Sequence, residues 1–102
     1  MSPDLIQQLQ AWYATHCNGE WEHGYGIKID TVDNPGWSVC IDLAGTPLAD
    51  APFPELKDLA PDDEWIHCVV KDRQFQGHGG PAMLSRIIQL FLEWSSRATV
   101  GR

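Results

Sequence analysis

The chain has 102 residues, a hydrophobic fraction of 43% and a formal net charge of -7 at pH 7. This length fits one globular domain and leaves little room for a second. The acidic balance argues against nucleic acid or anionic lipid as direct partners, whereas it suits a basic protein partner. No apolar run is long enough to span a membrane.

The cysteines and the first residues bear on the cellular compartment. Cys17, Cys40 and Cys68 cannot all pair with one another, and none stands in a C-x-x-C arrangement. Residues 1–4 lack the basic region and the apolar run of a signal peptide. These features predict a cytoplasmic protein with free thiols.

The N-terminal segment predicts a helix over residues 3–16. Ser2 suits the N-cap position, and a proline follows it at the first helical position. Leu5, Leu9 and Trp12 fall at i, i+4 and i+7, which gives the helix one apolar face. An Asn-Gly pair then favours the end of the helix.

Two segments with alternating apolar and polar residues follow, at residues 27–32 and 37–43. Between them, Pro35 and Gly36 suit the two central positions of a type II turn, in which the second residue takes φ > 0. The pattern predicts an antiparallel hairpin with one face toward the core and one toward water.

Residues 44–63 contain four prolines and predict a long surface loop with a short helical turn near residues 55–59. Residues 65–70 are apolar on both faces, which is typical of a strand inside a sheet. A turn follows, and a short fourth strand is predicted to start at Gln74.

The last part of the chain predicts a second helix over residues 81–95, which carries a broad apolar stripe. The glycine-rich residues 77–80 before it predict a tight link between strand and helix. A phosphate-binding loop is the alternative, but the segment lacks the Lys-Ser/Thr of a P-loop. Beyond the helix, residues 95–102 are expected to fray.

These elements predict an α+β fold. We expect a four-stranded antiparallel sheet in meander order, flanked by an N-terminal and a C-terminal helix on one face. Residues 1–102 would form a single domain with its core at about residues 3–95.

Side chains that could carry chemistry are scattered. Cys17, Glu22 and His23 form a loose cluster, and they define an alternative function as a small metal-binding or cysteine-dependent enzyme domain. Their spacing matches no structural zinc site, and a free cysteine is usually a small buried hydrophobe. We therefore expect no catalytic residue, no bound metal and no cofactor.

Acidic and aromatic residues gather in two segments. Residues 50–64 hold six acids against one lysine, and residues 20–26 combine two glutamates with Trp21 and Tyr25. Two interpretations of these aromatics stay open. They cover the edge of the core, or they are interface anchors ringed by acids.

A set of short motifs runs through residues 9–95 and is specific in combination. The motifs are Trp12-Tyr13, Cys17-x-Gly19-x-Trp21-Glu22-His23, Tyr25-Gly26-Ile27, Asp33-Asn34-Pro35-Gly36-Trp37, Ile41-Asp42-Leu43, Thr46-Pro47-Leu48, Trp65-Ile66, Gly77-x-Gly79-Gly80 and Phe91-Leu92-x-Trp94. With this combination the chain resembles the immunity protein 53 family.

The resemblance implies an α+β cytoplasmic inhibitor from a bacterial polymorphic toxin system. Such a protein binds a cognate toxin domain and blocks it by stoichiometric occlusion, with no direct contact to nucleic acid or membrane. If the toxin is a basic nuclease, acidic groups would stand in for phosphates. An acidic adaptor without a toxin partner is a third interpretation. The resemblance carries no residue roles, and the two acidic and aromatic segments give the expected toxin-binding residues as Glu20, Trp21, Glu22, Tyr25, Asp62, Asp63 and Glu64.

Overall fold

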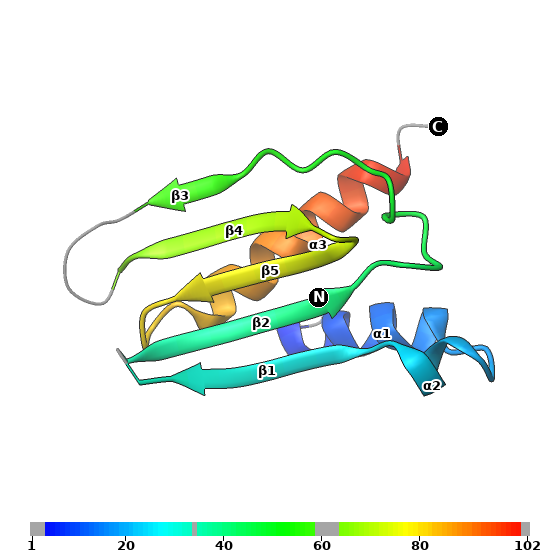
Figure 1. Ribbon diagram of the computed structural model, residues 1–102, viewed down its shortest axis with the longest axis horizontal. Coiled ribbons are helices and arrows are strands. Elements are labelled where there is room, and N and C mark those ends of the chain that lie inside the picture. Colours follow the sequence, from blue (N-terminus) through cyan, green and yellow to red (C-terminus); the bar gives the residue numbers. More distant parts are fainter. Residues whose placement is uncertain (1–3, 34, 59–63, 101–102) are drawn as a thin grey trace.

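A computed structural model of the protein describes residues 4–33, 35–58 and 64–100. These residues form an α+β fold in which five strands make one sheet (Figure 1). In chain order the elements are α1 (Leu5–His16), α2 (Trp21–Gly24), β1 (Ile27–Val32), β2 (Gly36–Asp42), β3 (Leu56–Asp58), β4 (Ile66–Lys71), β5 (Gln74–Gly79) and α3 (Leu84–Val100). No helix in these ranges is long and apolar enough to cross a membrane.

The strands lie in the order β1-β2-β5-β4-β3, and each neighbouring pair is antiparallel. The predicted antiparallel sheet is confirmed, but the four-strand meander is wrong. The chain leaves β2, crosses to the far edge to form β3, and returns as the β4–β5 hairpin, which pairs with β2. The extra strand β3 replaces the helical turn predicted near residues 55–59, because the open edge of β4 supplies its hydrogen-bonding partners.

The β1–β2 hairpin has the predicted strands but a different turn. Val32 pairs with Gly36, so Gly36 is the first residue of β2 and its φ is not positive. The predicted type II turn is therefore wrong. A Cβ on Gly36 would overlap the carbonyl oxygen of Gly79 in β5, so this position requires glycine because the two backbones approach closely.

The β4–β5 hairpin closes with a two-residue loop, since Lys71 pairs with Gln74. Asp72 and Arg73 take φ of 56° and 58°, as both central residues of a type I′ turn must. This turn lies where the sequence predicts one, although neither residue is glycine or asparagine.

Helix α1 begins after Asp4 rather than after Ser2. The Asp4 carboxylate accepts a 2.7 Å hydrogen bond from the Gln7 backbone N–H, and the Gln7 side chain accepts one from the Asp4 backbone N–H, which completes a capping box. At the other end of the chain, α3 spans Leu84–Val100, so the helix begins and ends later than the predicted 81–95, and the fraying expected from residue 95 is wrong up to Val100. The Trp94 indole N–H donates to the Pro52 carbonyl at 2.8 Å and holds this part of α3 against the loop before β3.

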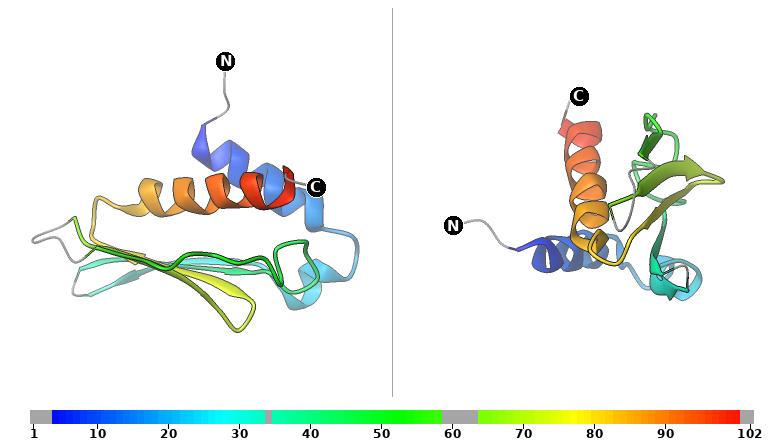
Figure 2. Two further views of the ribbon diagram at one scale, coloured as in Figure 1. Left: turned by 90° about the horizontal axis from the view of Figure 1, so that it is seen from above. Right: turned by 90° about the vertical axis from the view of Figure 1, so that its left-hand side faces the viewer.

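Helix α3 packs closely against β5, and α1 packs against α3. Figure 2 shows both helices on the same side of the sheet. A Cβ on Gly77 would come within 2.5 Å of Ile87 Cγ2, and one on Gly79 within 2.8 Å of Met83 Cβ. The glycine-rich segment predicted as a link is therefore mostly strand, and its bare backbone permits the close approach of α3. The buried core consists of Leu9, Val39, Ile41, Leu43, Leu48, Ile66, Cys68, Phe75, Ile87, Ile88, Phe91 and Trp94.

Candidate functional site

The loop between α1 and α2 is organised by two polar side chains. The Glu22 carboxylate accepts hydrogen bonds from the backbone N–H groups of Asn18 at 2.9 Å and Gly19 at 2.8 Å. The Asn18 side-chain oxygen accepts from the backbone N–H groups of Glu20 and Trp21, each at 2.9 Å. Gly19 takes φ of 92°, which favours glycine. These bonds fix the direction in which α2 leaves the loop.

The same donors act on the charge of Glu22. Hydrogen bonding to backbone N–H groups, first its own and then those of Asn18 and Gly19, lowers the pKa of the Glu22 carboxyl below its usual value. The carboxylate is therefore charged at neutral pH, and each of its oxygens already holds a loop N–H. Its main local role is to organise the backbone.

Trp21 fastens α2 to the rest of the fold. Its side chain is only 6% exposed, and its indole N–H donates to the Ala44 carbonyl at 2.8 Å, just beyond β2. Its ring packs edge-on against Trp12 with centroids 6.1 Å apart and lies 6.2 Å from the ring of Tyr25. The structure thus places Trp21 inside the molecule, whereas Tyr25 is 46% exposed.

A hollow of about 530 Å³ opens beside Tyr25, between α2, β1 and the adjoining ends of β2 and β5. We call it the α2 hollow. Its wall includes the carboxylates of Glu22 and Asp42, the amide of Gln74 and one lysine, Lys28. Asp42 accepts a 2.9 Å bond from the Gly26 N–H and a 2.8 Å bond from the Gln74 amide, which fixes its carboxylate. An exposed ring beside fixed acids suits contact with a basic protein surface.

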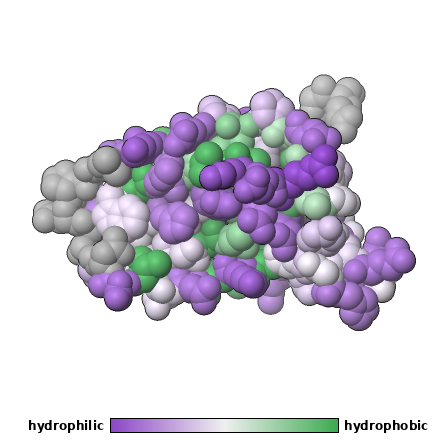
Figure 3. All heavy atoms as spheres, in the orientation of Figure 1, coloured by the Kyte–Doolittle hydropathy of each residue, from purple (hydrophilic) through white to green (hydrophobic). Residues whose placement is uncertain are grey.

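The α2 hollow lies at an edge of the sheet face that the helices leave uncovered. Figure 3 views this face and shows mainly hydrophilic side chains, as expected from the alternation in β1 and β2. Asp42 and Gln74 were not singled out in the sequence, because they are far from Tyr25 along the chain. Strand pairing in the β2–β5 ladder brings them together.

Of the second predicted cluster, the structure describes Glu64 alone. Asp62 and Asp63 fall outside the described residues, and Glu64 is exposed just before β4. The start of β4 pairs with the end of β5 next to the β1–β2 turn, whereas α2 leads into the opposite end of β1 (Figure 1). The structure therefore brings Glu20, Glu22 and Tyr25 together at one end of the sheet and places Glu64 at the other.

The other acids of residues 50–64 follow the β3 side of the sheet. Glu55 bonds the imidazole of His67 in β4 at 2.5 Å. Asp50 lies 3.9 Å from the guanidinium of Arg73, with both side chains exposed. Exposed ion pairs of this kind contribute little stability. The main effect of these acids is the negative electrostatic potential that they create along this edge of the sheet.

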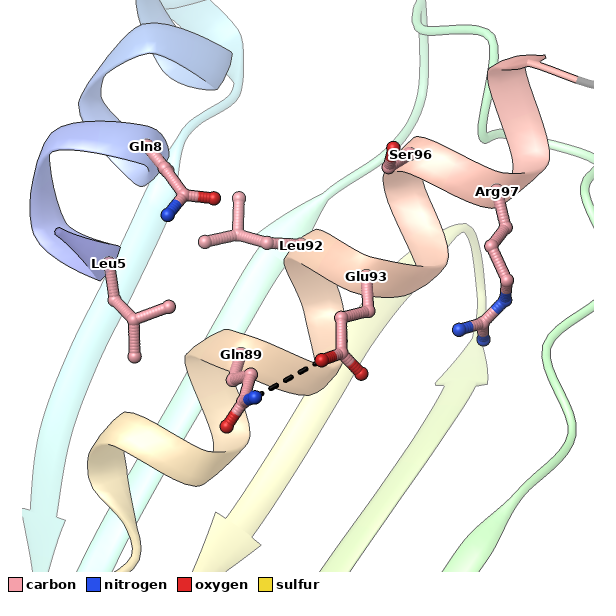
Figure 4. A pocket seen from close by; sticks show the side chains of 7 residues that line it. All are labelled: Leu5, Gln8, Gln89, Leu92, Glu93, Ser96 and Arg97. Atoms are coloured by element: carbon pink, nitrogen blue, oxygen red, sulfur yellow. Dashed lines mark hydrogen bonds between the residues drawn. The ribbon is translucent and has the colours of Figure 1, made fainter. Parts of the chain in front are cut away.

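A separate groove of about 460 Å³ lies between α1 and α3 (Figure 4). Leu5 and Leu92 separate its polar side chains, and the Gln89 amide donates to Glu93 at 3.1 Å along α3. Its polar groups do not converge on one point, and we assign it no chemical role.

The cysteines are free thiols in three different environments. Cys17 donates to the Tyr13 carbonyl at 3.3 Å. Cys68 is buried in the core, which raises its pKa to about 11, and burial also raises the pKa of Cys40. Within the residues that the structure describes, no three His, Cys, Asp or Glu side chains lie close enough to hold a metal ion.

Comparison with known proteins identifies the family of the chain. No curated protein and no solved structure shows significant similarity. The family model described as immunity protein 53 matches residues 6–96, which is most of the chain. The protein therefore belongs to the immunity protein 53 family.

Proposed function

We propose that this protein is an immunity protein that binds a cognate bacterial toxin domain and neutralises it by stoichiometric occlusion, without catalysis. The family match over residues 6–96 is the observation that carries this proposal. The protein acts in the cytoplasm of the cell that makes the toxin, as part of a polymorphic toxin system. A basic nuclease is the toxin class that its net charge of -7 suits best, because carboxylates then occupy a groove built for phosphates.

The tight contact is centred on the α2 hollow. Tyr25 supplies an exposed aromatic anchor, and Glu20, Glu22 and Asp42 place negative charge around it. Trp21 is buried and does not touch the toxin itself. It supports the contact indirectly, because its hydrogen bond to Ala44 holds α2 in place.

The acids Asp62, Asp63 and Glu64 contribute in a different way. Glu64 lies at the opposite end of the sheet from α2, so it does not extend the contact around Tyr25. The charge of the three acids instead attracts a basic toxin over a distance and speeds encounter.

The alternative function as a metal-binding or cysteine-dependent enzyme has no supporting observation. The Glu22 carboxylate is engaged by the loop N–H groups, and Cys17 is bonded to the Tyr13 carbonyl. We therefore do not propose a catalytic role for Cys17, Glu22 or His23.

Co-purification from the native cell, followed by mass spectrometry, identifies the toxin. Titration of the purified toxin domain should then give complete inhibition at equimolar protein, whereas a catalytic inactivator would act well below that ratio. An affinity-purified partner whose activity is unchanged by excess protein would overturn the proposal.

Variants then test the contact surface. Tyr25→Ala should weaken toxin binding by about tenfold or more. Tyr13→Ala is the matched control, since Tyr13 also packs on Trp21, at 5.9 Å, but lies outside the α2 hollow. Equal losses in both variants would remove the α2 hollow from the contact.

Reversal of Asp62, Asp63 and Glu64 to lysine tests the steering role. The association rate at low salt should fall about tenfold, the dissociation rate should change little, and the difference should shrink at high salt. Unchanged association kinetics would show that these acids serve solubility alone.

A further inference from the structure

An apolar groove of about 430 Å³ runs between α1 and the edge strand β1. Ile6, Tyr13 and Ile29 line it and are 53%, 38% and 38% exposed, respectively. None of the residues that line this groove is charged. Large apolar side chains gathered on one surface mark a contact with another macromolecule.

The backbone of β1 is open along the same groove. β1 is the first strand in the sheet order and pairs only with β2 among the described strands (Figure 1). The Asp42 N–H donates to the Gly26 carbonyl, so the even-numbered residues of this segment turn their backbone groups toward β2. Ile27, Ile29 and Thr31 therefore present their N–H and C=O groups at the free edge.

The sequence of β1 is complementary to itself when the strand is reversed. In an antiparallel pair with a second copy centred on Ile29, Ile27 lies opposite Thr31 and Lys28 lies opposite Asp30. Lys28 and Asp30 are both exposed and share the helix-free face. The two-fold axis would create this opposite-charge pair twice, at closely spaced non-hydrogen-bonded positions.

Neighbouring registers lack this complementarity. A shift of two residues places Lys28 opposite Lys28 or Asp30 opposite Asp30, and like charges directly opposite destabilise a strand pair. A shift of one residue sets a residue whose N–H and C=O groups lie at the free edge opposite a residue whose groups point toward its own β2, so the hydrogen-bond ladder cannot form. The register centred on Ile29 therefore satisfies both the backbone and the charges.

We propose that two copies of this chain pair antiparallel through β1, centred on Ile29, to form a dimer with one continuous sheet. About six backbone hydrogen bonds join the strands through Ile27, Ile29 and Thr31. On the helix side, the two Ile29 side chains meet, and the exposed sides of the two α1 helices, with Ile6 and Tyr13, close over them. The second copy of the chain covers the apolar groove and also pairs with the open edge of β1.

Charge exchange at Lys28 and Asp30 tests the register. Sedimentation equilibrium over a concentration series should show wild-type dimers, and Lys28→Asp or Asp30→Lys should raise the dimer dissociation constant about tenfold or more. The double exchange Lys28→Asp/Asp30→Lys should restore dimers, and an equimolar mixture of the two single variants should form heterodimers. Lys71→Asp in β4 and Asp58→Lys in β3 are the matched charge controls and should leave the dimer unchanged.

Two further measurements keep the proposal open to refutation. The amide protons of Ile27, Ile29 and Thr31 should exchange more slowly as concentration rises, and Ile29→Lys should abolish this protection while circular dichroism stays unchanged. A wild-type protein that remains monomeric at millimolar concentration overturns the proposal, as does a dimer that the double exchange fails to rescue. Loss of toxin binding in Ile29→Lys with a monomeric wild type would also overturn it, and would assign the edge to a toxin strand.

Discussion

The close contact between α3 and β5 predicts that Gly77→Ala destabilises the protein. The added methyl group would lie 2.5 Å from Ile87 Cγ2, 3.2 Å from Phe75 and 3.5 Å from the Cys68 sulfur. Since carbon atoms pack at about 3.5–4.0 Å, α3 must move away from the central strand by about 1 Å. Overpacking of this kind costs about 1–3 kcal/mol.

Urea denaturation followed by tryptophan fluorescence measures this cost directly, because the chain has five tryptophans. For a domain of this size, the loss corresponds to a melting temperature about 5–14 °C lower. Gly24→Ala is the matched control, since a Cβ there meets nothing within 4 Å and its φ is not positive. It should leave stability unchanged or raise it by up to about 1 kcal/mol.

A double-mutant cycle isolates the contact itself. In an Ile87→Ala background the clashing methyl group is gone, so Gly77→Ala should cost less there than in wild type by about 1 kcal/mol or more. A Gly77→Ala protein as stable as wild type would refute the reasoning, because it would mean that α3 does not rest on bare strand backbone.

The remaining predictions concern single groups. Gly36→Asn should lower the urea midpoint as Gly36→Ala does, because the obstacle is the Gly79 carbonyl; tolerance of asparagine alone would instead indicate a left-handed turn residue. Arg73→Gly should stabilise the protein by about 1 kcal/mol and so raise its melting temperature, because glycine takes a φ of 58° without strain. A lower melting temperature would mean that contacts of the arginine side chain contribute more than the strain costs. Cys68, with a pKa of about 11, should resist iodoacetamide at pH 8 until urea unfolds the chain, whereas Cys17 and Cys40 are less buried. Peptide mass mapping that finds Cys68 itself rapidly labelled in the native protein would contradict its burial. Glu22→Gln should be less stable than wild type at neutral pH. Because the pKa of Glu22 is lowered in the folded protein, this difference in stability should shrink as the pH falls through the folded pKa. A difference that does not depend on pH would exclude the carboxylate charge as its source.

The parts of the fold that follow local rules could be predicted from sequence. The alternation at residues 27–32 and 37–43 is set by neighbours in the chain, and it gives the β1–β2 hairpin. The helical apolar repeats likewise give α1 and α3. Strand order is different, because the β2–β5 pairing joins segments far apart in sequence.

Glycine positions show why tertiary contacts could not be inferred. Gly36 follows proline and Gly77 lies in a glycine-rich run, so both suggest turns by local criteria. In the structure each is a strand residue whose missing side chain makes room for another element. The reason for each glycine lies outside its own segment, and no local pattern carries that information.

The candidate surfaces likewise combine residues that are close in sequence with residues that only the fold brings together. Glu20, Glu22 and Tyr25 stand close together in sequence and were found, whereas Asp42 joins them only through the sheet. The exposed groove beside β1 was missed for another reason. Ile6 lies beside the apolar face of α1, and periodicity does not separate the centre of such a face from a margin that stays uncovered.

Burial of Trp21 links the fold to the proposed toxin contact. The side chain is bonded to Ala44 and packs on Trp12, while its own ring supports Tyr25 at the rim of the α2 hollow. Gly45, with φ of 78°, lets the chain pass close to this ring, since a Cβ there would lie 3.2 Å from Trp21 Cδ1. A substitution at Trp21 therefore moves α2 as well as removing an aromatic group. Loss of toxin binding in such a variant would reflect the placement of Tyr25, and direct contact has to be measured at Tyr25 itself.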